Sequence, residues 1–218
     1  MALIAIRKRS LLATTFVLAP ERYDPRRELD AGSVEIVPLG EIVKTVRKTI
    51  QPSEHVGLSL ILDTSDAREG IVIARKSPTT EIGSTKKITE PGDVIISRLR
   101  PYLRQIAYVD DAIPNATHST ITCSTEFYVL RSPNRESIAF LVPFLLAHQV
   151  QRVLAASQEG GHHPRFDEQT LVTLPVPKAL LSCRKEVSDG VARSVCEYRA
   201  SEARIDQLIF KAEAALTE

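Results

Sequence analysis

The most informative stretch of this sequence is residues 92–104, GDVIISRLRPYLR. A Gly-Asp pair predicts a turn, and the apolar run at residues 94–96 predicts a strand. Arg98 and Arg100 then alternate with an apolar residue, so both guanidinium groups are expected on one face of an extended segment. Pro101 has no backbone donor and is expected to bend the chain.

The same stretch concentrates side chains that suit nucleic acids. A guanidinium offers a planar pair of donors to phosphate oxygens and base edges, and a tyrosine adds a flat ring with a hydroxyl. The residues expected to contact DNA here are Arg98, Arg100, Tyr102 and Arg104, helped by Lys86 and Lys87. The alternative is that these arginines only keep an exposed strand end soluble.

Composition sets limits on this interpretation. The 218 residues are 43% hydrophobic and 25% charged, which fits one large domain or one domain with an appendage. The formal net charge is only +1, so the protein as a whole is not drawn to nucleic acid. Any such site must come from local clustering, which residues 68–104 supply.

Cysteine usage and the N-terminus bear on location. Cys123, Cys183 and Cys196 are odd in number and widely spaced, which fits neither a disulfide framework nor a zinc site. A reducing, cytoplasmic environment is therefore expected. Residues 1–20 place Arg-Lys-Arg before a short apolar run that lacks a cleavage pattern, and we interpret them as a strand. No stretch reaches the length of a membrane span.

The pattern of short segments predicts the fold class. Strand-like runs separated by Pro or Gly turns continue to about residue 129 and predict a curled, mostly antiparallel sheet. Residues 138–154 show helical periodicity, with Pro143 near the first turns or at a break between two helices. We therefore expect an α/β (α+β) domain with flanking helices, over residues 1–177.

From Lys178 the sequence predicts one long helix, residues 178–218. About 39 residues would extend nearly 60 Å, at about 1.5 Å each. An apolar seam of that length favours a partner helix, in the same chain or in another, over a helix folded back on the sheet. Gly190 could mark where the helix begins. The residues of the seam are Val187, Val191, Val195, Tyr198, Ile205, Leu208, Ile209 and Leu216.

Motifs of catalysis are missing from the sequence. It contains no P-loop, no dinucleotide-binding glycine fingerprint, no His-Glu-x-x-His and no nucleophile elbow. A glycine-rich loop for S-adenosylmethionine and the paired carboxylates of a metal-dependent nuclease are not evident either. We therefore expect a binding module without catalytic residues, cofactor or metal.

A second candidate cluster is His162, His163 and Arg165, which follow two glycines. The glycines allow close approach of the backbone, and the three side chains could contact phosphates or base edges. Adjacent histidines without a third ligand nearby argue against a metal site. A structural loop that caps the preceding helix is the alternative.

Three stretches resemble the specificity subunit of type I restriction-modification systems. Residues 37–43, VPLGEIV, are similar to the opening of a target recognition domain in that family. Residues 92–100 resemble its GDvliSr strand, and residues 157–165 followed by 174–177, LPVP, resemble its glycine loop and the strand before the long helix. With the terminal helix, the resemblance covers residues 35–217. It departs from the family at Gly-Gly-His-His, where a threonine more often follows the glycine.

This resemblance implies a domain that reads a half-site in double-stranded DNA and a helix that acts as a spacer. A full-length subunit has two such units, and this chain holds one. It would be a non-catalytic half-subunit that pairs through its helix, as a homodimer or with a second recognition chain. It would direct a DNA methyltransferase subunit to its target, and a restriction/translocase subunit is a further partner that the family allows.

Two other functions remain open from the residues. A stand-alone nuclease with a divergent metal site would cleave DNA in the presence of magnesium. A protein scaffold would use the long helix to bind a protein and would not recognise a DNA sequence.

Overall fold

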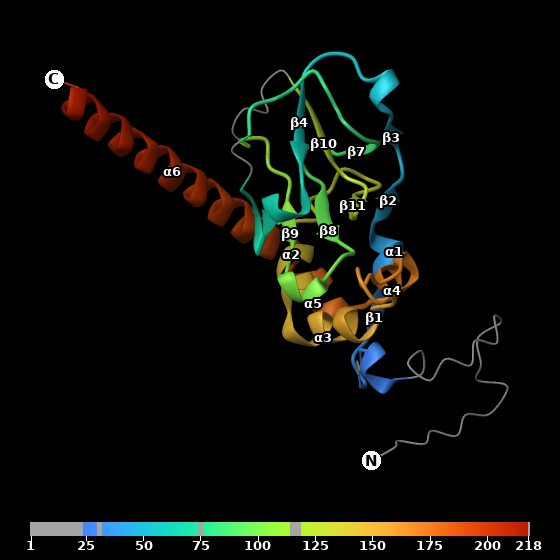
Figure 1. Ribbon diagram of the computed structural model, residues 1–218. Coiled ribbons are helices and arrows are strands. Elements are labelled where there is room, and N and C mark those ends of the chain that lie inside the picture. Colours follow the sequence, from blue (N-terminus) through green and yellow to red (C-terminus); the bar gives the residue numbers. More distant parts are fainter. Residues whose placement is uncertain (1–23, 30–31, 74–75, 114–118, 218) are drawn as a thin grey trace.

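The computed structural model describes residues 24–29, 32–73, 76–113 and 119–217 (Figure 1). The strand expected within residues 1–20 lies outside these residues. The described strands are β1 (Ile36–Pro38), β2 (Lys44–Val46), β3 (Thr49–Ile50), β4 (Ser59–Leu62), β5 (Ala67–Arg68), β6 (Gly70–Val72), β7 (Lys86–Ile88), β8 (Val94–Ser97), β9 (Ile106–Tyr108), β10 (Thr120–Ser124), β11 (Phe127–Arg131) and β12 (Pro175–Pro177).

The α-helices are short except for the last one. They are α1 (Leu39–Ile42), α2 (Leu141–Leu146), α3 (His148–Ala156), α4 (Glu168–Val172), α5 (Lys178–Ser182) and α6 (Arg184–Thr217). Single 3-10 turns are η3 (Pro25–Arg27), η4 (Pro52–Glu54), η5 (Thr64–Asp66) and η6 (Pro101–Leu103). None of the helices in the described ranges is both long enough and apolar enough to span a bilayer.

Strand β8, from the stretch that opened the sequence analysis, is the third strand of a six-stranded sheet in the order β2-β11-β8-β9-β6-β5. It pairs antiparallel with β11 on one side and with β9 on the other. All four of its residues are buried, and its side chains alternate between two hydrophobic clusters. Val94 and Ile96 belong to one cluster and Ile95 to the other. The strand therefore divides the core into two layers.

A four-stranded sheet, β3-β7-β10-β4, covers one layer of the core. Its Leu60, Leu62 and Cys123 pack with Phe127 and Val129 of the six-stranded sheet. The predicted curled, mostly antiparallel architecture is confirmed. Among the described strands, two pairs are parallel, β4 with β10 and β6 with β9.

The helices cover the other layer, and Figure 1 shows α1 to α5 gathered at the end of the domain opposite β3, β7, β10 and β4. The helix expected over residues 138–154 is two helices, because Ala147 adopts an extended conformation (ψ 139°) between α2 and α3. Pro143 lies in the first turn of α2, one of the two places expected for it. Gly70 allows β6 to approach α2 closely, since a Cβ there would lie 2.9 Å from Cγ1 of Val142.

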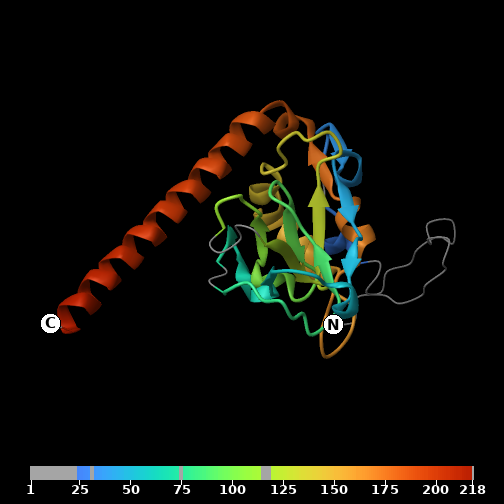
Figure 2. The ribbon, with the colours of Figure 1, turned by 90° about the horizontal axis from the view of Figure 1, so that it is seen from above.

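The long C-terminal helix is present, but the prediction that it starts at Lys178 is wrong. Cys183 (φ −102°, ψ 13°) separates the short helix α5 from α6, which begins at Arg184. Gly190 lies within α6 and does not mark its start. The 34 residues of α6 correspond to about 51 Å. Figure 2 shows that α6 leaves the domain as a straight rod with its C-terminus far from both sheets.

Candidate functional site

The arginine segment, residues 97–104, does not continue strand β8, and this corrects the expectation of one arginine face. The backbone N–H of Leu99 donates to Oγ of Ser97, which closes a turn directly after the strand. Arg100 then adopts a left-handed conformation (φ 48°), and Arg104 does the same (φ 52°). The simple alternation of side chains across a strand therefore ends at Ser97.

The histidine loop, residues 157–166, packs along this segment through backbone hydrogen bonds. The N–H of Arg100 donates to the carbonyl of Pro164 (3.2 Å), and the N–H of Phe166 donates to the carbonyl of Arg98 (3.1 Å). Leu99 and Arg165 form an isolated antiparallel bridge. The structure thus brings together the two clusters that the sequence nominated separately.

A carboxylate that the sequence analysis did not nominate joins the two clusters. Nε of Arg98 donates to Oε2 of Glu126 (2.9 Å), and Arg165 donates to both carboxylate oxygens of Glu126 (2.8 and 2.6 Å). Glu126 lies in the turn between β10 and β11, and the N–H of Arg98 also donates to its carbonyl. The hydrogen bonds from Arg165, and then those from Arg98, lower the pKa of Glu126 from 4.5 to about 2. The carboxylate is therefore ionised at neutral pH.

Lys87 is placed differently from its predicted role as a DNA contact. Its Nζ donates to the carbonyl of Phe127 (2.6 Å) and lies 5.5 Å from the ring centre of Tyr128. Burial lowers the pKa of Lys87, with a smaller contribution in the same direction from Arg98. The ammonium is therefore partly buried at the junction between the two sheets, and its predicted contact with DNA stays a prediction. Lys86 is half-buried and donates to Oγ of Ser84.

The histidine loop presents its two histidines outward. The N–H and C=O of Glu159 exchange hydrogen bonds with those of Arg165 (2.8 and 3.0 Å), so the chain between them forms a closed loop. Gly160 has a positive φ of 95° at the start of this loop, where a residue with a Cβ would be strained. His162 and His163 are both exposed, with ring centres 6.1 Å apart.

The rest of the arginine segment contributes an exposed ring and a paired arginine. Tyr102, in η6, is 60% exposed, and Arg100 beside it is half-buried. Nε of Arg104 donates to Oε1 of Glu69 (3.1 Å), so this arginine is partly neutralised by a carboxylate of the neighbouring turn. Of the candidate residues, Arg98, Arg104 and Arg165 form ion pairs within the described parts of the chain.

The predicted dimer seam divides into two halves. Val187 and Val191 pack against the hydrophobic cluster beneath the helices, and Val195 is 4% exposed. Val195 is therefore covered by this chain's own core, whereas Val187 and Val191 are only partly buried, and their place in an interface stays a prediction. The distal residues Ile205 and Leu208 are about half exposed (52% and 55%), as an uncovered seam would be.

Tyr198, a further seam residue, is half-buried near the end of the covered half of α6, where its hydroxyl donates to Glu202. In the distal half, Ile209 is 49% exposed and Leu216 is 86% exposed. Phe210, which the seam did not include, is 72% exposed. The uncovered seam therefore comprises Ile205, Leu208, Ile209 and Leu216.

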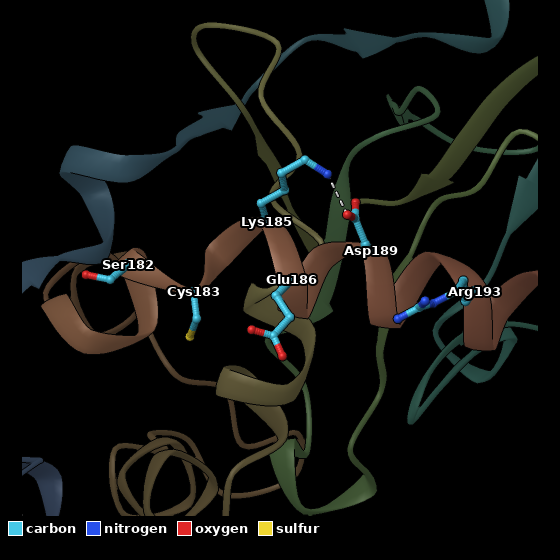
Figure 3. A pocket seen from close by; sticks show the side chains of 6 residues that line it. All are labelled: Ser182, Cys183, Lys185, Glu186, Asp189 and Arg193. Atoms are coloured by element: carbon cyan, nitrogen blue, oxygen red, sulfur yellow. Dashed lines mark hydrogen bonds and ion pairs between the residues drawn. The ribbon is translucent and has the colours of Figure 1, made fainter.

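An open pocket of about 510 Å³ lies where α5 meets α6 (Figure 3). Its polar lining includes Cys183, Glu186 and Arg193, and Lys185 forms an ion pair with Asp189 at 2.6 Å. None of its lining residues belongs to the arginine segment or the histidine loop. In the described ranges, no three His, Cys, Asp or Glu side chains gather closely enough to hold a metal ion.

Comparisons with known proteins address the fold. No protein-family model matches this chain, and no curated protein is significantly similar to it. One solved structure, described as the structural basis of complex assembly and conformational transition of the type I R-M system, matches with a TM-score of 0.53 and 22% identity. The match covers 86% of this chain and 50% of that chain.

A second solved structure, the HsdS subunit from Thermoanaerobacter tengcongensis, matches at 22% identity with a TM-score of 0.48. It covers 84% of this chain and 46% of the other. The chain therefore spans about half the length of these solved chains. The class that the fold defines is a mixed α/β domain with a long terminal helix. More particularly, it is the fold of a solved chain of a type I R-M system, which is the system that the sequence resemblance also indicated.

Proposed function

We propose that this chain is a non-catalytic DNA-recognition subunit of a type I restriction-modification complex. The observation that carries the proposal is the junction of the arginine segment with the histidine loop. Two clusters of DNA-binding side chain types, distant in sequence, share one surface and are fixed to each other by Glu126. The fold of the chain supports the same function.

The arrangement favours two roles on this surface: some side chains hold the histidine loop in position, and others contact DNA. Arg98 and Arg165 are tied to Glu126 and hold the loop in position, and together the three charges leave one net positive charge toward the DNA. Arg100 offers a planar donor pair for phosphate or base edges. His162 and His163, at the exposed end of the loop, offer ring N–H donors to the same groups.

The distal half of α6 supports pairing with a second recognition unit. Ile205, Leu208 and Ile209 recur at helical spacing and are about half exposed. Pairing of two copies about a two-fold axis would give a palindromic target made of two half-sites. We further propose that the paired chains serve a DNA methyltransferase subunit and a restriction/translocase subunit in the cytoplasm, and that residues 1–177 and 178–218 act as recognition and pairing units.

The test is selection of bound sequences from a randomised duplex library by the purified chain, alone and with its methyltransferase subunit. Two short half-sites at a fixed separation are expected. A single short motif would retain recognition and remove the homodimer. No enrichment in the presence of the methyltransferase subunit would refute the proposal, and magnesium-dependent cleavage by the chain alone would favour a nuclease.

Substitutions then test whether DNA recognition depends on the junction of the arginine segment with the histidine loop. Arg100→Ala and Tyr102→Ala together should abolish enrichment or relax its sequence, because they remove an exposed ring and a donor fork. Lys185→Ala is the matched control, since it removes a positive charge that is 87% exposed on α6, in a different part of the fold. Equal losses from both changes would show non-specific attraction and would remove the junction from the proposal.

A further inference from the structure

One arginine ties helix α6 to the sheet at the point where the helix leaves the domain. Nη2 of Arg199 donates to Oδ2 of Asp110 (2.9 Å) and to the carbonyl of Val72 (2.7 Å), and Nη1 donates to Oε2 of Glu202 (2.9 Å). The side chains of Arg199 and Asp110 are only 9% and 8% exposed. We call Arg199, Asp110, Glu202 and the carbonyl of Val72 the helix clamp.

The domain side of the helix clamp is itself held in place. Asp110 follows strand β9, and its Oδ1 accepts the N–H of Ala112 (3.1 Å). Val72 ends strand β6, which pairs with β9 in the six-stranded sheet. The clamp therefore connects α6 to two hydrogen-bonded strands of the core, which gives the helix a rigid support.

The contacts of α6 nearer its start have a different character. Val187 and Val191 pack against the apolar cluster, and Val195 is buried, so these contacts are non-directional. Oγ of Ser188 also accepts a hydrogen bond from the N–H of Phe140 (3.1 Å). The forked, charge-assisted bonds of Arg199 add an orientational constraint that apolar packing does not supply.

Beyond the helix clamp the side chains of α6 are exposed. From residue 203 to residue 216 every side chain of α6 is exposed. The segment after Arg199 is about 27 Å long, and a swing of about 10° at the clamp would move its end by about 5 Å. That displacement exceeds the rise of one base pair of B-form DNA, about 3.4 Å. A small change of direction is therefore enough to change the separation of two recognition units.

We propose that the helix clamp sets the direction of the distal arm of α6 and thereby fixes the spacing between the two half-sites of the target. The part about spacing rests on the proposed function. The part about helix direction rests only on the contacts of Arg199. Arg199 is in this sense a positioning residue, which acts on DNA through the helix.

The direction of the helix is tested by a distance measurement between spin labels. Labels are attached at Lys44→Cys in β2 and Lys211→Cys in α6, and Cys183 and Cys196 are replaced by serine. An excess of unlabelled protein suppresses the signal from pairs of labels on different copies. The parent protein should give one narrow distance distribution. Arg199→Gln should broaden or shift it by on the order of 5 Å, and Lys185→Gln should leave it unchanged. An Arg199→Gln distribution with the same mean distance and the same width as that of the parent would overturn the proposal.

Two further measurements separate the outcomes. If circular dichroism shows that Arg199→Gln does not fold, Glu202→Gln, which retains the Asp110 pair, should still broaden the distribution by a smaller amount. In library selection, Arg199→Gln should keep the bases of each half-site and accept separations that differ by one or more base pairs. If Arg199→Gln broadens the distance distribution but leaves the separation of the half-sites unchanged, the helix clamp has no role in spacing. No enriched site for the parent would refute the proposed function, and a single short motif would remove the paired target and with it the spacing role; in both cases the distance result alone decides the clamp.

Discussion

Replacement of Glu126 by glutamine tests the junction between the arginine segment and the histidine loop. The amide has the size of the carboxylate, but it carries no charge and its NH2 group would face guanidinium donors. The change therefore removes the attraction to Arg98 and Arg165 and leaves two positive charges side by side. We expect a less stable protein with a more mobile histidine loop.

The magnitude follows from the environment of the carboxylate. A pKa lowered from 4.5 to about 2 corresponds to at most about 3.4 kcal/mol at about 1.36 kcal/mol per unit. The side chains of Arg98 and Arg165 are 36% and 39% exposed, so water screens part of this attraction. The expected loss in the free energy of unfolding at neutral pH is therefore about 1–2 kcal/mol.

The assay is urea unfolding of both proteins across a range of pH. Because the pKa of Glu126 is lower in the folded protein, its contribution is fully present above about pH 4.5 and is lost as the pH falls toward about 2. The difference between the parent and Glu126→Gln should therefore shrink over that interval. Amide exchange at Phe166, whose N–H is bonded to the carbonyl of Arg98, should be faster in the variant.

Glu35→Gln is the matched control, because the Glu35–Lys178 pair is exposed on both sides (78% and 55%). Its effect should stay within about 0.5 kcal/mol. The reasoning would be refuted by a Glu126→Gln effect no larger than this control at neutral pH. A difference that stays constant as the pH falls would also refute it.

Three other changes test separate parts of the structure. Arg100→Ala should weaken binding to the selected DNA by about 1–3 kcal/mol in a titration with labelled duplex, and unchanged affinity would exclude Arg100 from the interface. Val195→Ala should lower the free energy of unfolding by about 2 kcal/mol because it opens a space under α6. Leu208→Ala should instead leave the stability of the single chain unchanged and weaken self-association about tenfold in sedimentation experiments. The reverse result would place the interface on the proximal half of the helix. Gly70→Ala should cost about 1–3 kcal/mol in urea unfolding, since φ is 103° and the added Cβ would meet Val142 at 2.9 Å, and a neutral effect would show that β6 and α2 can move apart.

Local patterns in the sequence predicted the architecture well. Alternation and turn residues indicated short strands in a mostly antiparallel sheet, and the apolar run at residues 94–96 became the central strand β8. The period of apolar residues predicted a long terminal helix, and it is present as α6. These features depend on neighbours within a few residues, which is why the sequence alone determines them.

Side-chain partners distant in sequence were decided only by the tertiary structure. Glu126 joins Arg98 to Arg165, and Asp110 joins Arg199 to the sheet, but an isolated acidic residue in a turn carries no local signal of its partner. The seam of α6 shows the same limit. Helical periodicity indicates that one face is apolar, and it does not tell whether that face is covered by the domain or left exposed. Packing against the core covers the first half, and the domain ends before it can cover the second.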